Sequence, residues 1–275
     1  MPDLAAAGPW TPPPGHGYAK LWMKWLYGFG YHPAGGGSTV DYARYNEVFF
    51  ATYGEYGLAD GLAIYWQTDL LRIFTLVDSP SDERRVHTTP GDPALGLRWR
   101  WLNLGRFVMA LEGGVRAPLA DADPKQIVYS RQAPYRRVGA LQVGAGVWNG
   151  DARLSAGYGF DRVYLAASVG YQWRSGGFRD RITWSAEVGG RFSDRWSGRA
   201  RASGAHSLAL AGDDAPLAET PSGIGNGVSW AGLALELDYR LGERWFVGLT
   251  LEGGLGDLRS QTGGPVTSLW VATRF

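Results

Sequence analysis

The stretch SLWVATRF, residues 268–275, has the alternation of a β-strand and closes on an aromatic side chain. Successive side chains of a strand point to opposite faces, so every second residue shares a face. The two faces are Leu269, Val271, Thr273 and Phe275 on one side, and Ser268, Trp270, Ala272 and Arg274 on the other. Terminal residues of an ordinary soluble domain usually fray. The aromatic end of this stretch instead predicts a strand that is anchored up to its last residue.

The composition is that of a strand-rich protein. The 275 residues include 41 glycines, 13 tryptophans and 14 tyrosines, which suit strands, tight turns and interfacial belts better than helices. No window approaches the roughly 18 consecutive apolar residues that a transmembrane helix needs. The net charge of +1 and the hydrophobic content of 45% argue against a nucleic-acid-binding protein and against a disordered chain.

Alternating segments separated by turn residues repeat along almost the whole chain. Residues 135–148 could form a further strand, but placing most of them in a loop keeps the even strand number of single-chain bacterial barrels. We therefore predict twelve strands. Their spans are 17–31, 40–57, 61–76, 94–103, 106–117, 144–160, 162–174, 180–192, 195–208, 226–241, 244–257 and 265–275.

The connections between these strands fall into two alternating classes. The tight class is 58–61, 103–106, 160–162, 192–195 and 241–244, and the long polar class is 32–39, 77–93, 118–143, 175–180, 211–225 and 259–264. Short periplasmic turns and long extracellular loops are typical of outer-membrane barrels. We predict an all-β fold, a transmembrane antiparallel β-barrel of twelve strands in the cell outer membrane. Residues 1–16 would be an N-terminal periplasmic segment and residues 17–275 a single barrel domain.

The tight turns also share a pattern of an arginine followed by an apolar or aromatic residue, as in LGRF (104–107), FDRV (160–163), SDRW (193–196) and GERW (242–245). Aromatic side chains gather at both interfaces of a membrane barrel, with basic residues just outside. We predict a membrane girdle at the tight-turn end. Its members are Trp101, Phe107, Phe160, Phe192, Trp196, Tyr239, Trp245 and Phe275.

The polar faces of the strands would line the lumen and form the path of a solute. The predicted lining is Lys20, Lys24, Glu47, Asp69, Arg98, Arg100, Glu112, Arg153, Arg174, Glu187, Arg191, Arg199, Arg201, Glu236 and Arg240. Basic side chains outnumber acidic ones on this face. Two interpretations remain open: the charges pair across the interior and fill it, or surplus arginines form a ladder that favours anions. The ladder would include the pairs Arg98/Arg100 and Arg199/Arg201.

The sequence has no persuasive motif for catalysis or metal binding. A serine and a histidine on one strand need an i,i+2 spacing to share a face, whereas His206 and Ser207 are adjacent. The acidic pairs Asp121/Asp123 and Asp213/Asp214 lie among Pro and Gly and suit solvated turns better than a metal site. We expect no enzyme activity, no cofactor and no bound metal.

Two stretches carry a family resemblance. EYGLADGLAI (55–64) and GDPALGLRWRWLNLGRFVMALEGGVRAP (91–118) resemble the outer-membrane barrels assigned to transport in the meta-cleavage pathway of phenol degradation. The family's Pro-Thr-Gly-Asp is replaced here by Pro118-Leu119-Ala120-Asp121. PWTPPPGHGYAKL (9–21) resembles the start of a related group of barrels from exopolysaccharide loci. The resemblance implies a membrane barrel and a transport role.

The pattern and the resemblance together predict a channel for passive diffusion of a small anionic solute. The alternative is a closed structural barrel that serves a polysaccharide-export or surface-adhesion system through a periplasmic partner. The expected partners are outer-membrane lipid and the solute, with no nucleic acid, and the expected oligomeric state is a monomer. A lipid-modifying enzyme is the weakest of the three hypotheses.

Overall fold

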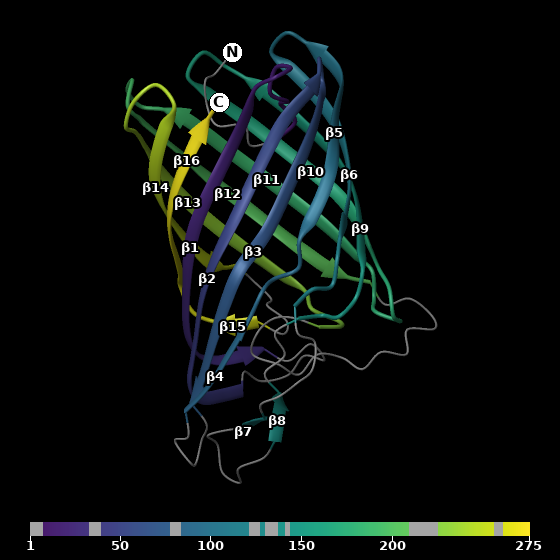
Figure 1. Cartoon of the computed structure of the whole chain (residues 1–275), viewed down its shortest axis with the longest axis vertical. Helices are drawn as coiled ribbons and strands as arrows, with labels where there is room; N and C mark the ends of the chain where they lie inside the picture. Colours follow the sequence, from purple (N-terminus) through teal and green to yellow (C-terminus); the bar gives the residue numbers. More distant parts are fainter. Residues whose placement is uncertain are drawn as a thin grey trace.

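The protein is a closed antiparallel barrel of twelve strands (Figure 1). The computed structural model describes residues 8–32, 40–77, 84–120, 127–129, 137–140, 144–208, 225–255 and 261–275. Each barrel strand pairs with the strands before and after it, and β1 closes the ring against β16. The barrel strands are β1 (Gly17–His32), β2 (Val40–Ala59), β3 (Leu62–Val77), β5 (Ala94–Leu104), β6 (Phe107–Arg116), β9 (Asn149–Gly159), β10 (Val163–Arg174), β11 (Arg181–Arg191), β12 (Trp196–Ser207), β13 (Trp230–Arg240), β14 (Trp245–Gly254) and β16 (Val266–Arg274).

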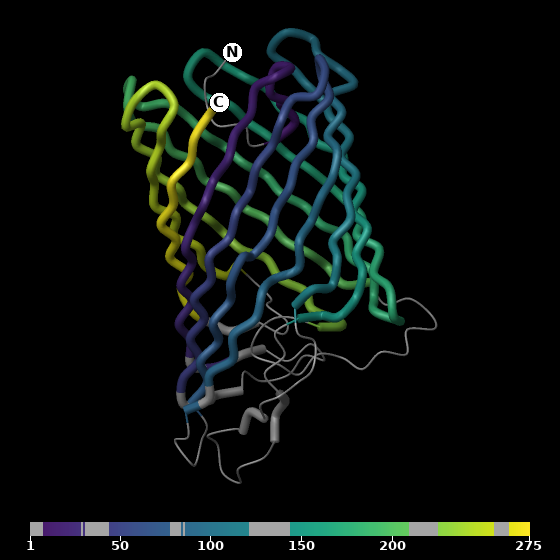
Figure 2. The backbone as a smooth tube through the Cα atoms, in the orientation of Figure 1, coloured from purple at the N-terminus to yellow at the C-terminus, as the bar shows by residue number. Residues whose placement is uncertain are grey.

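These twelve strands confirm the predicted fold and the even strand number. The residues 137–140 do form a strand, β8 (Arg137–Ala140), but it pairs with β7 (Ile127–Tyr129) in a separate two-stranded sheet outside the barrel. Two further short strands, β4 (Arg84–Thr89) and β15 (Gln261–Gly263), extend the barrel wall beside β3 and β1. Figure 2 shows that β1, β2 and β3, in purple and blue, reach further than the other strands at the end of the barrel opposite the two chain termini. None of the described residues forms a helix that is long and apolar enough to cross a bilayer.

The tight turns gather at one end of the barrel, where β1 also begins and β16 ends (Figure 1). Two of these turns need glycine, because Gly61 and Gly105 have φ angles of 74° and 71°, a region that other residues rarely adopt. The last residue is held by the barrel: Gly17 N donates to Phe275 O at 2.8 Å, and Phe275 N donates to Gly17 O at 3.1 Å. The chain end is therefore part of the sheet, as its alternation predicts.

The outer face of the barrel is apolar and the inner face is polar. Along β10, Val163, Leu165, Val169 and Trp173 are exposed on the outside, whereas Tyr164 faces the interior and is only 3% exposed. The 12 residues of β10, rising roughly 3.3 Å each and tilted by roughly 40°, span about 30 Å along the barrel axis. This height matches the apolar thickness of a bilayer.

A β-bulge in β3 changes which residues face inward. Phe50 pairs with Leu71 but the next residue, Ala51, pairs with Asp69, so Leu70 is an extra residue. Leu70 and Leu71 are both exposed. Because a bulge shifts the alternation by one position, Asp69 and Arg72 share the inner face although they are three residues apart.

Aromatic rings on the inner face lie flat over glycines of the neighbouring strand. Trp270 is paired directly with Gly248, and Tyr65 with Gly96. A Cβ atom added at either glycine would overlap the ring. Glycine thus lets a large side chain lie along the wall, which leaves the centre of the barrel open.

Candidate functional site

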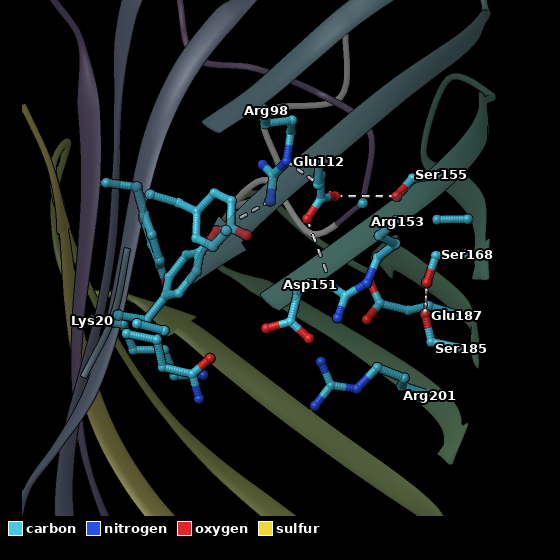
Figure 3. A pocket seen from close by; sticks show the side chains of 18 of the residues that line it. Lys20, Arg98, Glu112, Asp151, Arg153, Ser155, Ser168, Ser185, Glu187 and Arg201 are labelled. Atoms are coloured by element: carbon cyan, nitrogen blue, oxygen red, sulfur yellow. Dashed lines mark hydrogen bonds and ion pairs between the residues drawn. The ribbon is translucent and has the colours of Figure 1, made fainter. Parts of the chain in front are cut away.

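The interior holds a cavity of about 380 Å³ between two unlike walls (Figure 3). The aromatic wall comprises the inward aromatic side chains of β16, β1, β2 and β3, namely Tyr18, Trp22, Tyr53, Tyr65 and Trp270. The serine wall comprises the inward serines of β9, β10, β11 and β12. Ser155, Ser168 and Ser185 line the cavity, and Ser203 continues their row in register. Binding sites for small molecules typically enclose 300–1,000 Å³, so the cavity has room for a small solute.

The serine wall is a row of hydroxyl groups in strict register. Ser168 pairs with Ser155 on one side and with Ser185 on the other, and Ser185 pairs with Ser203. The hydroxyl oxygens of Ser168 and Ser185 are 2.8 Å apart, and the Ser155 hydroxyl donates to Glu112 Oε1 at 3.1 Å. Four small polar side chains in one registered row leave more space inside this wall, because a serine side chain is much shorter than the aromatic rings opposite it.

Two ionic networks join the walls. The first consists of Glu55, Arg98, Glu112 and Arg153. Arg98 Nη1 lies 2.7 Å from Glu55 Oε2, and its Nε lies 3.3 Å from Glu112 Oε1. Arg153 Nη1 is 3.6 Å from Glu112 Oε2. Arg98, Glu55 and Glu112 are all buried, so their charges must compensate one another.

The second network consists of Lys20, Arg199 and Glu236. Glu236 forms ion pairs with Lys20, whose Nζ lies 3.1 Å from its Oε2, and with Arg199. Its Oε2 also accepts a hydrogen bond from the Thr250 hydroxyl at 2.9 Å. Lys20 also lies over the Trp270 ring, 3.9 Å from its centroid, which is within the range of a cation–π interaction. This network connects β1 with β12, β13 and β14, on the opposite flank from the first network.

Residues 8–16 fold against the inner wall at the tight-turn end. The Trp10 ring meets Tyr164 edge-on with centroids 5.3 Å apart, and its carbonyl accepts a hydrogen bond from Arg98 Nη1 at 3.2 Å. Gly157 gives the Trp10 ring space, since a Cβ atom there would lie 2.7 Å from it. Further along, Gly15 N donates to Gly57 O at 3.0 Å. The segment therefore narrows the lumen at this end.

The structure brings nine of the predicted lining residues together at the cavity: Lys20, Lys24, Arg98, Glu112, Arg153, Glu187, Arg199, Arg201 and Glu236. Lys24 pairs with Glu252 at 2.7 Å. The Glu187 carboxylate accepts a hydrogen bond from the Tyr164 hydroxyl. Arg201 is exposed to the cavity and makes no ion pair or hydrogen bond with another described residue.

The other six predicted lining residues lie away from the cavity. Glu47 and Asp69 both approach Arg72, which pairs with Glu47 and lies 3.8 Å from Asp69. Arg100 pairs with Asp60 of a tight turn at 2.7 Å. The remaining three are at strand ends.

Those three have different surroundings. Arg174 is buried and donates to Gly225 O at 3.0 Å. Arg191 is exposed at the end of β11. Arg240 donates to Gly242 O of its own turn at 2.7 Å. None of these three faces the cavity between the walls.

The residues of the predicted girdle lie at the tight-turn end of the barrel. Six of them are exposed: Trp101 (44%), Phe160 (44%), Phe192 (66%), Trp196 (43%), Trp245 (53%) and Phe275 (48%). Phe107 and Tyr239 are partly buried, and the Tyr239 ring packs against Trp196 with centroids 4.8 Å apart. Exposed tryptophans at the other end, Trp148, Trp173 and Trp184, were not singled out by the sequence reasoning. They lie near the ends of β9, β10 and β11 and suit a second interfacial belt.

Sequence reasoning missed four inward-facing features of the barrel. Arg72 was not predicted to face inward, because the bulge at Leu70 reverses the alternation between Asp69 and Arg72. The row of serines was not predicted, because its alignment depends on the register between four strands. Trp10 lies outside the strands, and nothing in the sequence reasoning placed it in the lumen. Asp151, which accepts a hydrogen bond from Gln172 at 2.8 Å, is the one that alternation along β9 could have identified.

Within the described ranges, no group of three His, Asp or Glu side chains could hold a metal ion. The acidic pairs Asp121/Asp123 and Asp213/Asp214 lie outside the described residues. His206 and Ser207 lie on opposite faces of β12, since His206 is exposed and Ser207 is partly buried.

Comparison with solved structures gives the same fold. An outer-membrane channel of the COG4313 group from Pseudomonas putida F1 is similar over 99% of this chain and 100% of its own, with a TM-score of 0.67 and 12% identity. The KdgM porin is more distant: the likeness covers 94% of this chain and 99% of the porin, with a TM-score of 0.50 and 8% identity. The translocator domain of the autotransporter NalP from Neisseria meningitidis is similar over 99% of this chain and 90% of its own, with a TM-score of 0.50 and 11% identity. No family model and no curated protein sequence matches the chain. These likenesses establish an outer-membrane type of barrel.

Proposed function

We propose that this chain is an outer-membrane channel through which a small solute diffuses passively, with anions favoured. The observation that carries the proposal is the polar cavity of about 380 Å³ inside a closed barrel whose outer face is apolar. A lumen lined by charged and hydroxyl side chains lowers the cost of moving a polar solute across the hydrocarbon region. The resemblance of residues 55–64 and 91–118 to transport barrels supports the role of a channel rather than a particular solute.

The path would run from the long loops, between the aromatic and serine walls, to the tight-turn end. Membrane barrels of this type keep short turns in the periplasm and long loops outside the cell, so the tight-turn end would be periplasmic. Residues 8–16 would then form the narrowest part of the path, because Trp10 packs across the inner wall there. The mechanism needs no covalent step and no nucleotide.

The charge of the cavity supports the preference for anions. Seven basic side chains line it, against five acidic ones: Lys20, Lys24, Arg98, Arg116, Arg153, Arg199 and Arg201, against Glu112, Asp151, Glu187, Glu236 and Glu252. An excess of positive charge in a narrow, poorly solvated space attracts anions and repels cations.

Planar-bilayer recording of the purified protein tests this proposal. We expect discrete conductance steps in KCl and a reversal potential, under a salt gradient, that is shifted toward the chloride equilibrium potential. A variant lacking residues 2–11 should have a larger single-channel conductance, because Trp10 no longer narrows the lumen. If neither protein conducted at any voltage, the channel would be contradicted. A cation-selective reversal potential would contradict the anion preference.

The second candidate is a closed barrel that acts through a periplasmic partner. The observation that favours it is that residues 8–16 and the two ionic networks already occupy part of the lumen. This candidate predicts no conductance in the full chain or in the shortened variant, together with a protein from the periplasm that co-purifies in fixed stoichiometry.

A further inference from the structure

Arginines are not equivalent within the cavity. Arg98 and Arg199 are each held by carboxylates at close range, so their charge is compensated by the protein. Arg201 has no ion pair or hydrogen bond with any described residue, and it is exposed to the cavity. Arg153 has one loose ion pair, at 3.6 Å, and its side chain is 43% exposed. These two guanidinium groups have donors left to offer a solute.

Both arginines flank the serine wall. Arg153 is the inward residue before Ser155 on β9, and Arg201 is the inward residue before Ser203 on β12. The strands β9 and β12 run in opposite directions, so the two arginines lie on opposite sides of the serine row. Because Ser155 and Ser203 are the two ends of one registered row, the arginines lie at opposite corners of the wall. Figure 3 shows Arg153 and Arg201 extending from the side of the serines into the open space.

Hydroxyl groups of the wall can also donate into the cavity. Ser168 and Ser185 share one hydrogen bond at 2.8 Å. A pair of hydroxyl groups has two protons and uses only one for this bond, so one O–H remains free. The two hydroxyls therefore provide a short, neutral donor between the two cationic corners.

Acidic groups on the same side accept hydrogen bonds from other side chains. Asp151 accepts a hydrogen bond from Gln172, and Glu187 accepts one from Tyr164. In the register of β11 and β12, Glu187 is paired directly with Arg201, and Arg199 lies two residues before Arg201 on β12. Asp151 and Glu187 form no ion pair with Arg153 or Arg201, so the guanidinium groups keep their donors.

We infer that the serine wall with Arg153 and Arg201 is a binding site for the oxyanion group of a small solute, a carboxylate or a phosphate. This inference rests on the proposed channel and names the class of solute that its lumen selects. The forked donors of arginine match two oxygens of an oxyanion, and charge-assisted hydrogen bonds are stronger than neutral ones. The rest of the solute would face the aromatic wall across the cavity.

Isothermal titration of the full chain in detergent tests the site with three probes that share one sugar ring: D-glucuronate, D-glucose 1-phosphate and D-glucose. We expect saturable binding of one or both charged probes and none of glucose. Binding of glucuronate alone would identify a carboxylate site, and binding of glucose 1-phosphate alone a phosphate site. Glucose binding as tightly as the charged probes would overturn the inference.

Variants locate the site. Arg201→Ala should weaken binding of the charged probe about tenfold, Arg201→Lys should weaken it less, and the double variant Ser168→Ala/Ser185→Ala should weaken it by a smaller factor. Arg244→Ala removes the same charge from an exposed tight turn and should leave binding unchanged. Equal losses in Arg201→Ala and Arg244→Ala would overturn the inference, because the effect would then be one of net charge.

Conductance in KCl separates this inference from the proposed channel. A protein that conducts but binds neither charged probe overturns the oxyanion site and leaves the channel standing. A protein that binds a charged probe through Arg201 but never conducts retains the site and overturns the channel.

Discussion

The aromatic wall and the serine wall are built from the same kind of strand but leave very different space inside the barrel. In the aromatic wall, β1, β2 and β3 have 16, 20 and 16 residues and β16 has 9, and large rings lie flat over glycines of neighbouring strands. In the serine wall, strands of 11 or 12 residues present a row of small hydroxyl groups. The cavity therefore arises from a difference in side-chain size around the ring, and the two ionic networks hold the unlike halves together.

The largest effect should come from breaking the first network. Arg98→Ala leaves Glu55 and Glu112 buried without their main partner, and removing one member of a buried ion pair costs about 3–5 kcal/mol. Urea unfolding in detergent, followed by tryptophan fluorescence, measures this loss. The matched control is Arg201→Ala, which removes an unpaired arginine of the serine wall and should change stability by about 0.5 kcal/mol or less. Equal losses in the two variants would show that the networks do not join the walls.

A smaller effect is expected from crowding the aromatic wall. Gly248→Ala places a methyl group where the Trp270 ring lies, and overpacking of this kind costs about 1–3 kcal/mol. The displaced indole would move toward the lumen, so conductance should fall as well. Gly253→Ala on the same strand is the control, because nothing lies within 4 Å of its added Cβ atom. If both variants lost the same stability, the glycine would not be needed to accommodate the ring.

The smallest effect is expected in the serine wall. Ser168→Ala removes the 2.8 Å hydrogen bond to Ser185, and a hydrogen bond of this kind is worth about 1 kcal/mol. Ser203→Ala, in the same row, removes a hydroxyl that has no hydrogen-bond partner among the described residues and should cost less. A loss in Ser168→Ala as large as that in Arg98→Ala would contradict the division into a structural half and an open half.

Much of this architecture follows from local pattern. Alternation along β10 and β16 identified the inner and outer faces, because the strand period is two and one face must be apolar in a membrane. The twelve strands and the two classes of connection were predicted for the same reason. What alternation could not supply is the identity of direct neighbours. Ser155, Ser168, Ser185 and Ser203 lie in four separate strands, and only register makes them a row.

The candidate site was less predictable than the fold. Arg98 and Arg201 have the same chemistry and both face inward, yet one is buried between two carboxylates and the other is free of ion pairs with the described residues. Sequence spacing treats them alike because the partners of Arg98 come from two other strands, β2 and β6, which alternation along β5 does not identify. The bulge at Leu70 adds a further uncertainty, since a single extra residue moved Arg72 from the outer to the inner face.

By itself, the sequence determined the strand class, the number of barrel strands, the apolar exterior and the polar interior, because each of these depends on neighbouring residues and on the environment of one face. Only the tertiary structure decided which charges pair, where the cavity lies and that Trp10 folds into the lumen. Those features depend on the register between strands and on the closure of the barrel, which bring together side chains that local spacing cannot relate.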